Sequence, residues 1–428
     1  MTVRDHECDL LVIGGGVNGA GIACDAAGRG LDVVLAEQDD LAGATSSASS
    51  KLIHGGLRYL EHYEFRLVRE ALTEREILLA KAPHIIWPLR FVLPHLPGMR
   101  PAWMLRLGLF FYDHLGRKTR LADSVGVDLA TDPAGEPLRG SLKKGFAYSD
   151  CRVDDARLVV LNAMQAAGKG ARILTRHRLL SARRVDGRWE ARLLDRLGKR
   201  TLTIVATALV NATGPWVERL FDDALETPSR RKVRLVKGSH IVVPRLYAGG
   251  HAYILQHQDG RVVFVLPYED EFSLIGTTDV PFEGDPAAVA ISEEETAYLI
   301  QAVGQYFRTE LGPGDVVQSY AGIRPLYDDA ADDPSAVTRD YVVELDQAGS
   351  VAPPLLSVYG GKITTYRRLA EQALEKLGPF FPEMGSPWTE GAPLPGGDVA
   401  GGDMEALVAD LAASYPGLGP AYLKALAR

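Results

Sequence analysis

The chain has 428 residues, of which 46% are hydrophobic and 24% charged, and these values exclude whole-chain disorder and the collagen-like and fibrous classes. Its 47 Lys and Arg against 55 Asp and Glu give a net charge of -8, which argues against nucleic acid as a partner because such binding normally needs a basic face. Cys8, Cys24 and Cys151 are too few and too scattered for a disulfide framework or a zinc site. No apolar run in the sequence predicts a membrane-spanning helix, and the charged residues 1–9 do not predict a secretory signal. A reducing cytoplasmic setting fits this composition, which also leaves attachment to a membrane surface open.

The first elements predict a nucleotide-binding unit. Residues 9–13 (DLLVI) form a short apolar run that predicts a strand buried on both faces of a parallel sheet. An alanine-rich helix is predicted over 16–29 and a second strand over 32–37. The stretch from 9 to 37 is therefore predicted to be a β-α-β unit.

The rest of the chain alternates between helical and strand-like patterns. A helix is predicted over 65–81, the prolines between 83 and 101 predict a loop-rich stretch, and a helix follows near 154–168. Strands of a small sheet are predicted at 172–174, 189–194 and 201–210, and a mainly antiparallel sheet at 233–244, 252–255, 261–267 and 273–279. The remaining predictions are a helix at 292–309, a strand at 355–358, a helix at 362–377, a Pro/Gly-rich connector at 387–402 and a helical stretch at 404–428.

The turn after the first strand carries a dinucleotide-binding pattern. Gly14, Gly16 and Gly19 satisfy G-x-G-x-x-G directly after that strand and at the start of a helix. Gly14 permits the tight turn, Gly16 lets the backbone approach a pyrophosphate, Gly19 allows close helix-strand packing, and the helix N-terminus supplies N–H donors. Glu37 ends the second strand, where its carboxylate can accept from a ribose hydroxyl. A glycine-rich turn without a ligand is the alternative, and the motif alone does not separate FAD from NAD.

Two further segments favour a flavin. Residues 209–216 (LVNATGPW) form an apolar strand that ends at Ala212 and Gly214, a pattern that recurs in flavoproteins where a later strand returns beside FAD, although a plain strand-to-turn junction fits equally well. The loop 44–51 (ATSSASSK) carries Thr45, Ser46 and Ser47, whose hydroxyls can bond a cofactor phosphate or cap a helix.

Several segments together resemble the FAD-dependent glycerol-3-phosphate dehydrogenases. Residues 13–25 with 29–30 look like the first signature of that family and 360–370 (GGKITTYRRLA) like the second, and 45–61, 237–240 and 321–326 also resemble its pattern. The resemblance runs from residue 9 to about 395. It implies oxidation of sn-glycerol 3-phosphate to dihydroxyacetone phosphate, with electrons passing through FAD to a quinone at the cytoplasmic face of the inner membrane. Family members usually carry a longer helical C-terminal domain than this chain shows.

The resemblance also implies a fold and a set of cofactor contacts. The fold is mixed α/β, of the amino-acid-oxidase type, with a Rossmann-like FAD-binding domain interleaved with an antiparallel-sheet substrate domain. The FAD-binding domain is expected at 1–82, 152–225 and 330–385, the substrate domain at 83–151 and 226–329, and the start of a helical C-terminal domain at 386–428. The expected cofactor contacts beyond the glycines of the turn are Asn18, Glu37, Thr45, Ser46, Ser47, Lys51, Leu52, Ala212, Gly214, Gly361, Lys362 and Thr364.

The substrate of that family needs cations for its phosphate. Arginine suits a phosphate because its planar fork can bond bidentately, and Arg58, Arg324 and Arg339 lie in motif-like surroundings rather than in surface charge runs. The resemblance places all three at the substrate, whereas a solvated surface cation is the ordinary alternative. Tyr59 can hydrogen-bond the phosphate or simply pack.

Alcohol oxidation also needs a proton acceptor and a cation near the cofactor. His240 is the proposed acceptor because an imidazole is neutral near working pH, and it can instead bond the phosphate or fill the sheet. His54, beside two glycines, is the second candidate. Lys362 follows two glycines where a helix is predicted to begin, so its ammonium can stabilise negative charge on a reduced flavin.

Residues 99–120 form a basic, aromatic segment within an acidic protein. This composition is typical of a helix that lies in a membrane interface, and a core helix or a homodimer interface is the alternative. Two other functions stay open from sequence: an oxidase of the same fold that reduces oxygen and acts on glycerol 3-phosphate or an amino acid, and a non-catalytic flavin or dinucleotide sensor.

Overall fold

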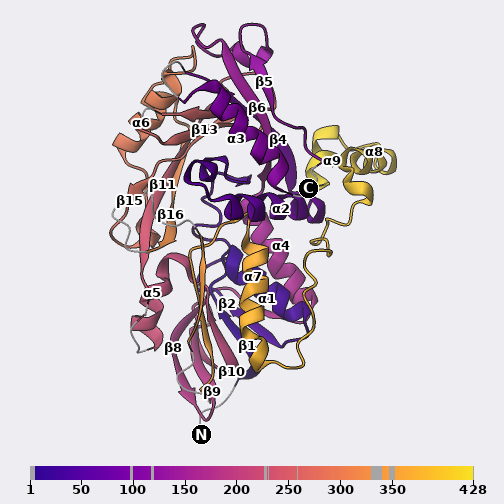
Figure 1. The fold of residues 1–428 in the computed structure, drawn as a ribbon. Coiled ribbons are helices and arrows are strands. Elements are labelled where there is room, and N and C mark those ends of the chain that lie inside the picture. The colour runs from indigo at the N-terminus through magenta and orange to yellow at the C-terminus, as the bar shows by residue number, and fades with distance from the viewer. Residues whose placement is uncertain are drawn as a thin grey trace.

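The chain folds around two β-sheets that lie one above the other (Figure 1). The computed structural model describes residues 5–96, 100–116, 120–225, 229, 231–257, 259–328, 340–346 and 352–427. The sheet that contains β1 (His6–Ile13) occupies the lower half of Figure 1 and the larger sheet the upper half, while α8 (Met404–Ser414) and α9 (Pro420–Leu426) project to one side. Among the described residues, no helix is long and apolar enough to cross a bilayer.

The first sheet is mainly parallel. Its strand order is β17 (Val342–Asp346), β18 (Leu355–Tyr359), β10 (Arg200–Asn211), β1, β2 (Val33–Ala36) and β7 (Arg172–Leu174), with β17 antiparallel to β18 and the other neighbours parallel. A hairpin of β8 (His177–Val185) and β9 (Arg188–Asp195) joins it through antiparallel pairing of β9 with β10.

Strand β1 shows why a strand of this sheet appears in the sequence as a continuous apolar run. Leu10 and Val12 belong to the core beneath α1 (Val17–Gly28), α4 (Asp155–Gly168) and α7 (Tyr366–Leu377), whereas Leu11 and Ile13 belong to the core on the opposite face. That second core includes side chains of β8, β9 and the π-helical turn Phe221–Leu225 after α5 (Val217–Leu220). Since successive strand residues point to opposite faces, both faces are buried, as predicted.

The second sheet is mainly antiparallel, as predicted. Its strand order is β15 (Val280–Pro281), β11 (Val233–Pro244), β14 (Phe272–Gly276), β13 (Val262–Tyr268), β12 (Ala252–Gln256), β4 (Ile86–Pro94), β6 (Lys144–Val153) and β3 (Leu52–Ile53). Strand β16 (Gln318–Tyr327) also pairs with β11, and β5 (Val125–Asp128) with β6. The pairing of β12 with β4 is parallel. The two sheets together confirm the predicted mixed α/β class.

Helices cover both faces of the second sheet. Helix α6 (Glu293–Gly304) covers one face, where its Leu299 packs with Ile241 of β11. Helices α2 (Phe65–Lys81) and α3 (Ala102–Leu115) cover the other, where Leu72 and Leu109 pack with Val242. A further core of side chains from α1, α2, α4, β3, β4 and β6 joins the two sheets.

The structure corrects three sequence predictions. The proline-bearing stretch after residue 83 contains strand β4, which pairs with β6 along its whole length, Pro88 and Pro94 included. On its other side β4 pairs with β12 only at Phe91 and Val92, so neither proline has a ladder partner there. The predicted small sheet at 172–210 does not stand alone, because β7 and β10 join the parallel sheet. Helix α7 begins at Tyr366 rather than at Lys362, which lies in the preceding turn.

Candidate active site

The turn between β1 and α1 is built from close backbone contacts. Gly14 has φ +110, and a Cβ there would lie 2.5 Å from the carbonyl oxygen of Ala212. A Cβ at Gly19 would lie 1.9 Å from the carbonyl oxygen of Gly14. Both positions therefore need glycine, for the left-handed backbone at Gly14 and for the helix-strand packing at Gly19.

The open end of this turn faces the start of α1. A Cβ at Gly16 would meet only the Ser46 Oγ, at 3.3 Å, so the backbone there is accessible to a ligand. Ser46 Oγ accepts a hydrogen bond from the backbone N–H of Val17 at 3.0 Å and so caps α1. The Glu37 carboxylate accepts from the backbone N–H of Gly15 at 2.7 Å and of Asp39 at 2.8 Å. Burial raises the pKa of Glu37, and these two hydrogen bonds oppose the rise.

The carboxyl ends of β1, β10 and β18 meet at the same edge of the sheet. Ala212, just after β10, donates its N–H to the carbonyl of Ile13 at 2.9 Å, and Gly214 follows with φ +56. After β18, Gly360 and Gly361 have φ +80 and +105, and the Asn18 Nδ2 donates to the carbonyl of Gly360 at 3.1 Å. The Asn18 Oδ1 is buried and has no partner among the described residues. This glycine cradle and the helix N-terminus fit the pyrophosphate of a dinucleotide, whose oxygens accept hydrogen bonds. The Asn18 Oδ1 is itself an acceptor, so it fits a donor, such as a hydroxyl of the cofactor, rather than the pyrophosphate.

The hydroxyl-rich loop bonds to the protein around it. Thr45 donates to the carbonyl of Ile323 at 2.6 Å, and Ser47 to the carbonyl of Ala44 at 3.2 Å. Lys51 donates to the Asp155 carboxylate at 2.7 Å and to the Ser47 carbonyl at 3.2 Å. Leu52 follows, buried in β3. The loop is thus anchored to β16 and to the first turn of α4 through Asp155, a contact that the sequence pattern did not reveal.

His240 is a buried imidazole on β11. Its side chain is 2% exposed and stacks on Tyr320, with ring centroids 4.8 Å apart. Its Nε2 lies 2.9 Å from the Ser50 Oγ, and its Nδ1 has no partner among the described residues. Burial, together with the positive charges of Arg324 and Lys51, lowers the pKa of His240 to about 3. The ring is therefore neutral across ordinary working pH.

Arg324 lies on β16, next to β11. Its guanidinium forms an ion pair with Asp279 and donates to the Thr277 Oγ1 at 2.9 Å and to the Thr278 carbonyl at 3.3 Å. It is about one third exposed, so it still presents an accessible surface. Asp279 and Thr277 hold this arginine in place, and no sequence motif pointed to them.

A second set of predicted residues is joined by contacts of His54 with Thr364 and of Tyr59 with Lys362, and Arg58 is the neighbour of Tyr59 in sequence. The N–H of His54 donates to the Thr364 Oγ1 at 3.3 Å, and the His54 Nδ1 accepts from the N–H of Gly56 at 3.1 Å. The Lys362 Nζ lies 4.2 Å from the centre of the Tyr59 ring. Within the described ranges, the half-buried Arg58 side chain has no ion pair or hydrogen bond. Arg339, the third predicted phosphate ligand, lies outside the described residues.

One stretch of chain, residues 45–59, contacts three parts of this site. Ser46 caps the helix of the dinucleotide turn, Ser50 bonds His240, and His54 bonds Thr364. Predicted residues that are far apart in sequence are thus brought to one region between the two sheets.

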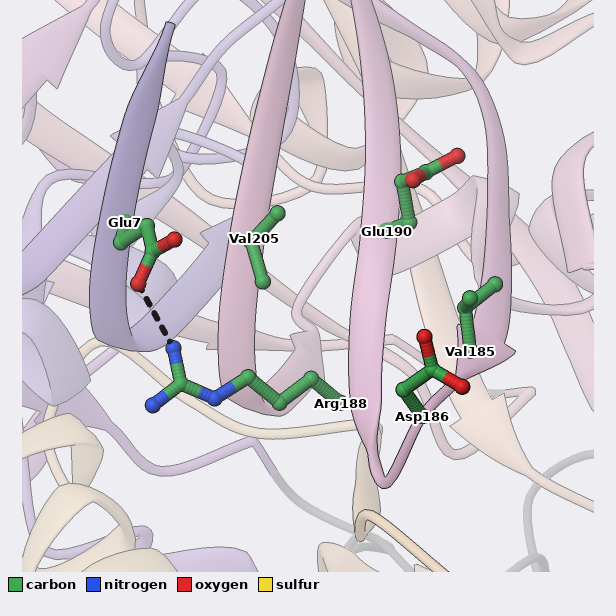
Figure 2. A pocket seen from close by; sticks show the side chains of 6 residues that line it. All are labelled: Glu7, Val185, Asp186, Arg188, Glu190 and Val205. Atoms are coloured by element: carbon green, nitrogen blue, oxygen red, sulfur yellow. Dashed lines mark hydrogen bonds and ion pairs between the residues drawn. The ribbon is translucent and has the colours of Figure 1, made fainter. Parts of the chain in front are cut away.

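A surface pocket of about 260 Å³ lies elsewhere (Figure 2). Its lining residues are Glu7, Val185, Asp186, Arg188, Glu190 and Val205, and Figure 2 shows the ion pair between Glu7 and Arg188. Glu7 is near the amino end of β1, seven residues before Gly14 and so about 23 Å from the dinucleotide turn at about 3.3 Å per strand residue. This pocket takes no part in the site.

Comparisons with known proteins identify similar chains. A family model described as FAD dependent oxidoreductase (DAO) matches residues 9–366. The glycerol-3-phosphate dehydrogenase of Pseudomonas aeruginosa is 60% identical over 407 residues, which cover 95% of this chain and 78% of that protein. The D-erythritol 1-phosphate dehydrogenase of Brucella abortus is 57% identical over 411 residues, which cover 96% and 82%. The X-ray structure of the glycerol-3-phosphate dehydrogenase from Bacillus halodurans complexed with FAD matches with a TM-score of 0.76 and 29% identity, over 98% of this chain and 75% of that chain.

The dinucleotide turn gives a first prediction. Gly19→Ala should abolish flavin retention, because the added Cβ would lie 1.9 Å from the Gly14 carbonyl oxygen and force the turn open. The ratio of flavin to protein absorbance in the purified protein measures this. Gly168→Ala is the matched control, since a Cβ at Gly168 in α4 meets nothing within 4 Å. Equal flavin content in the two variants would contradict this account of the turn.

His240 gives a second prediction, on stability. The unfolded chain protonates this histidine near its ordinary pKa of 6.5, whereas the folded chain does so only near 3. The stabilisation is therefore complete above pH 6.5 and is lost as the pH falls towards 3, with a slope of up to about 1.4 kcal/mol per pH unit. In urea unfolding between pH 7 and pH 4, His240→Gln should lose less stability than the wild type. Parallel curves would show that His240 is not buried as a neutral ring.

Proposed function

Because the chain belongs to the FAD-dependent glycerol-3-phosphate dehydrogenases of the DAO family, we propose that it oxidises the secondary hydroxyl of sn-glycerol 3-phosphate to give dihydroxyacetone phosphate. Membership confirms the resemblance found in the sequence, and the family's cofactor is FAD. The observation that carries the proposal is 60% identity over 95% of the chain to a glycerol-3-phosphate dehydrogenase.

The residues at the sheet edge suit FAD. The backbone at Gly14 and Gly16 and the N–H groups of α1 that follow Val17 would hold the pyrophosphate, since the Val17 N–H already donates to Ser46. The unpaired Asn18 Oδ1 offers a buried acceptor beside Gly361. Glu37 is the proposed ribose ligand, and it already fixes the turn through Gly15. When bound, FAD supplies the acceptor for the hydride from C2 of the substrate.

We assign the substrate phosphate to Arg58 and Arg324. Arg58 has no protein ligand in the described part of the chain, so its five donors are available to a dianion. Arg324 is oriented by Asp279 and Thr277, and this pairing leaves it fixed rather than free to reorient. We keep Arg339 and Tyr59 as further proposed ligands.

We assign the hydroxyl proton to His240. Its imidazole is neutral, and its Nδ1 has no partner among the described residues, so Nδ1 retains capacity for a further hydrogen bond. The His54 Nδ1 already accepts from Gly56, so a neutral His54 ring carries its proton on Nε2 and acts as a donor there. This contrast favours His240 over His54 as the base. Lys362 supplies a cation for the negative charge that develops on the cofactor.

The surface of α3 supports attachment to a membrane and hence a quinone acceptor. Its exposed apolar side chains are Trp103, Met104, Leu107, Phe110 and Phe111. Phe65 of α2 extends the patch, with its ring centre 6.0 Å from that of Phe111. Arg100 and Arg106 lie beside these side chains in sequence, as expected of a helix in the interface of an anionic bilayer.

A second substrate deserves a direct test, because the Brucella abortus relative is a D-erythritol 1-phosphate dehydrogenase with 57% identity to this chain. Both substrates present a phosphate and a secondary hydroxyl, so the arginines do not distinguish them. Oxygen as the acceptor is the other alternative, and release of hydrogen peroxide would reveal it.

The substrate assignment gives a third prediction. Anaerobic glycerol 3-phosphate should bleach the oxidised-flavin absorbance of the holoenzyme, with a lower KM than D-erythritol 1-phosphate. Arg324→Ala should raise that KM by about 10- to 100-fold, as loss of a charge-assisted hydrogen bond implies. Arg219→Ala is the control, because Arg219 also pairs with an aspartate, Asp285, but at the surface. No bleaching of the wild type would overturn the proposed function.

The membrane assignment gives a fourth prediction. Replacing Trp103, Phe110 and Phe111 by Ser should release the protein from anionic lipid vesicles in a flotation assay while leaving its flavin content unchanged, because these exposed side chains contribute little to the core. Leu197→Ser and Val317→Ser, at exposed apolar positions elsewhere, should leave binding intact. Unchanged flotation of the triple variant would show that α3 is not the attachment surface.

A further inference from the structure

The side that α3 turns toward the protein carries a polar anchor. Leu109 and Tyr112 are the buried residues of this helix, and Tyr112 is 3% exposed. The Tyr112 hydroxyl lies 2.7 and 2.8 Å from the two carboxylate oxygens of Asp150 on β6, to which it donates. Asp150 is 2% exposed, and Arg75 of α2 donates to it at 2.8 Å. Three separate elements thus meet at one buried carboxylate.

The fourth member of this network is the backbone of Gly55. Its N–H donates to the Tyr112 hydroxyl oxygen at 2.8 Å and to the Asp150 Oδ1 at 3.3 Å. A Cβ at Gly55 would lie 2.4 Å from Leu72 and 2.7 Å from the Tyr112 hydroxyl, so the backbone approaches both as closely as glycine permits. Because this N–H is buried, water offers no substitute for these two acceptors.

The direction of the hydrogen bonds is fixed by charge. Burial, and then the nearby Asp150 carboxylate, raise the pKa of Tyr112 well above its ordinary value, so the hydroxyl stays protonated. It therefore donates to Asp150 and accepts from Gly55 at the same time. Removing the hydroxyl leaves the Gly55 N–H with only the longer of its two bonds.

Gly55 stands between two proposed functional residues. On one side, His54 is bonded through its own N–H to Thr364. On the other, Gly56 has φ +72 and opens the 3-10 helix Leu57–His62, which carries Arg58. The position of the Gly55 amide therefore sets where that short helix starts and where the Arg58 side chain leaves the backbone.

We propose that Tyr112 and Asp150 are positioning residues for the substrate loop 54–58. They hold the Gly55 amide so that Arg58 faces the substrate phosphate, and neither side chain touches the substrate. This inference rests on the proposed function, specifically on Arg58 as a phosphate ligand. The buried side of α3, through Tyr112, would thus affect substrate affinity, whereas its exposed apolar side is the proposed membrane surface.

Tyr112→Phe tests the proposal in the FAD-loaded enzyme. The KM for glycerol 3-phosphate and the inhibition constant of inorganic phosphate should both rise by about 5- to 20-fold, a range that matches loss of one hydrogen bond to a buried amide. The kcat should change by less than about twofold, and the flavin content and spectrum should stay as in the wild type. The matched control is Tyr148→Phe: Tyr148 is also 2% exposed and meets the Tyr112 ring edge-on with centroids 5.7 Å apart.

The possible outcomes distinguish a failure of the positioning role from a failure of the proposed function. A wild type that glycerol 3-phosphate does not reduce would refute the proposed function. An active wild type, with Tyr112→Phe and Tyr148→Phe equal in KM and in phosphate inhibition, would refute the positioning role alone. If Tyr112→Phe does not fold, deuterium exchange of the wild-type holoenzyme decides: slow exchange of the Gly55 amide supports the anchor, and fast exchange overturns it.

Discussion

The whole site depends on how closely backbone segments approach one another at the carboxyl edge of the parallel sheet. The carbonyl of Gly14 fills the space where a Cβ of Gly19 would stand, and the carbonyl of Ala212 fills the corresponding space at Gly14. These contacts bring the ends of β1 and β10 together and point the first N–H groups of α1 outward. Apart from Ser46, whose hydroxyl accepts from the Val17 N–H, no side chain lies within 4 Å of where a Cβ of Gly16 would stand, and the dipole at this helix terminus favours negative charge.

The electrostatics of the site follow from which charges are paired. Lys51 is paired with Asp155 and Arg324 with Asp279, whereas Arg58 has no ligand in the described ranges. Burial is the largest cause of the lowered pKa of His240, and the positive charges of Arg324 and Lys51 lower that pKa further. A positive charge that attracts the substrate phosphate also lowers the pKa of a nearby imidazole. Arg324, which is proposed to bind the dianion, therefore also helps to keep the proposed base neutral. The overall net charge of -8 gives no hint of it.

Much of the fold and the cofactor turn could be predicted, because those signals are local. The apolar run at 9–13 and the glycines after it lie within a few residues of one another, and the resemblance identified the family. Strand β4 was missed because its prolines dominate the pattern, whereas its antiparallel pairing with β6 involves a segment that is distant in sequence. Tyr112, Asp150 and the neighbouring residues Thr277 and Asp279 left no local signal: they come from three separate segments, and only the folded chain brings them to Gly55 or Arg324. The start of α7 was misplaced for a related reason, since the two glycines with positive φ hold Lys362 in a turn.

Helix α3 carries apolar side chains on two sides, and the two sides face different surroundings. A helix that is hydrophobic all round is stable only where something covers both faces. On the inner face, Leu109 and Tyr112 pack into the core on this side of the second sheet, and the Tyr112 hydroxyl is bonded to both Gly55 and Asp150. The outer face, with Trp103 and Phe110, is exposed in the isolated chain, and a bilayer interface would cover it. Since Asp150 anchors both this helix and the Gly55 amide, the surface that would meet lipid and the loop that would meet substrate are fixed to the same buried carboxylate.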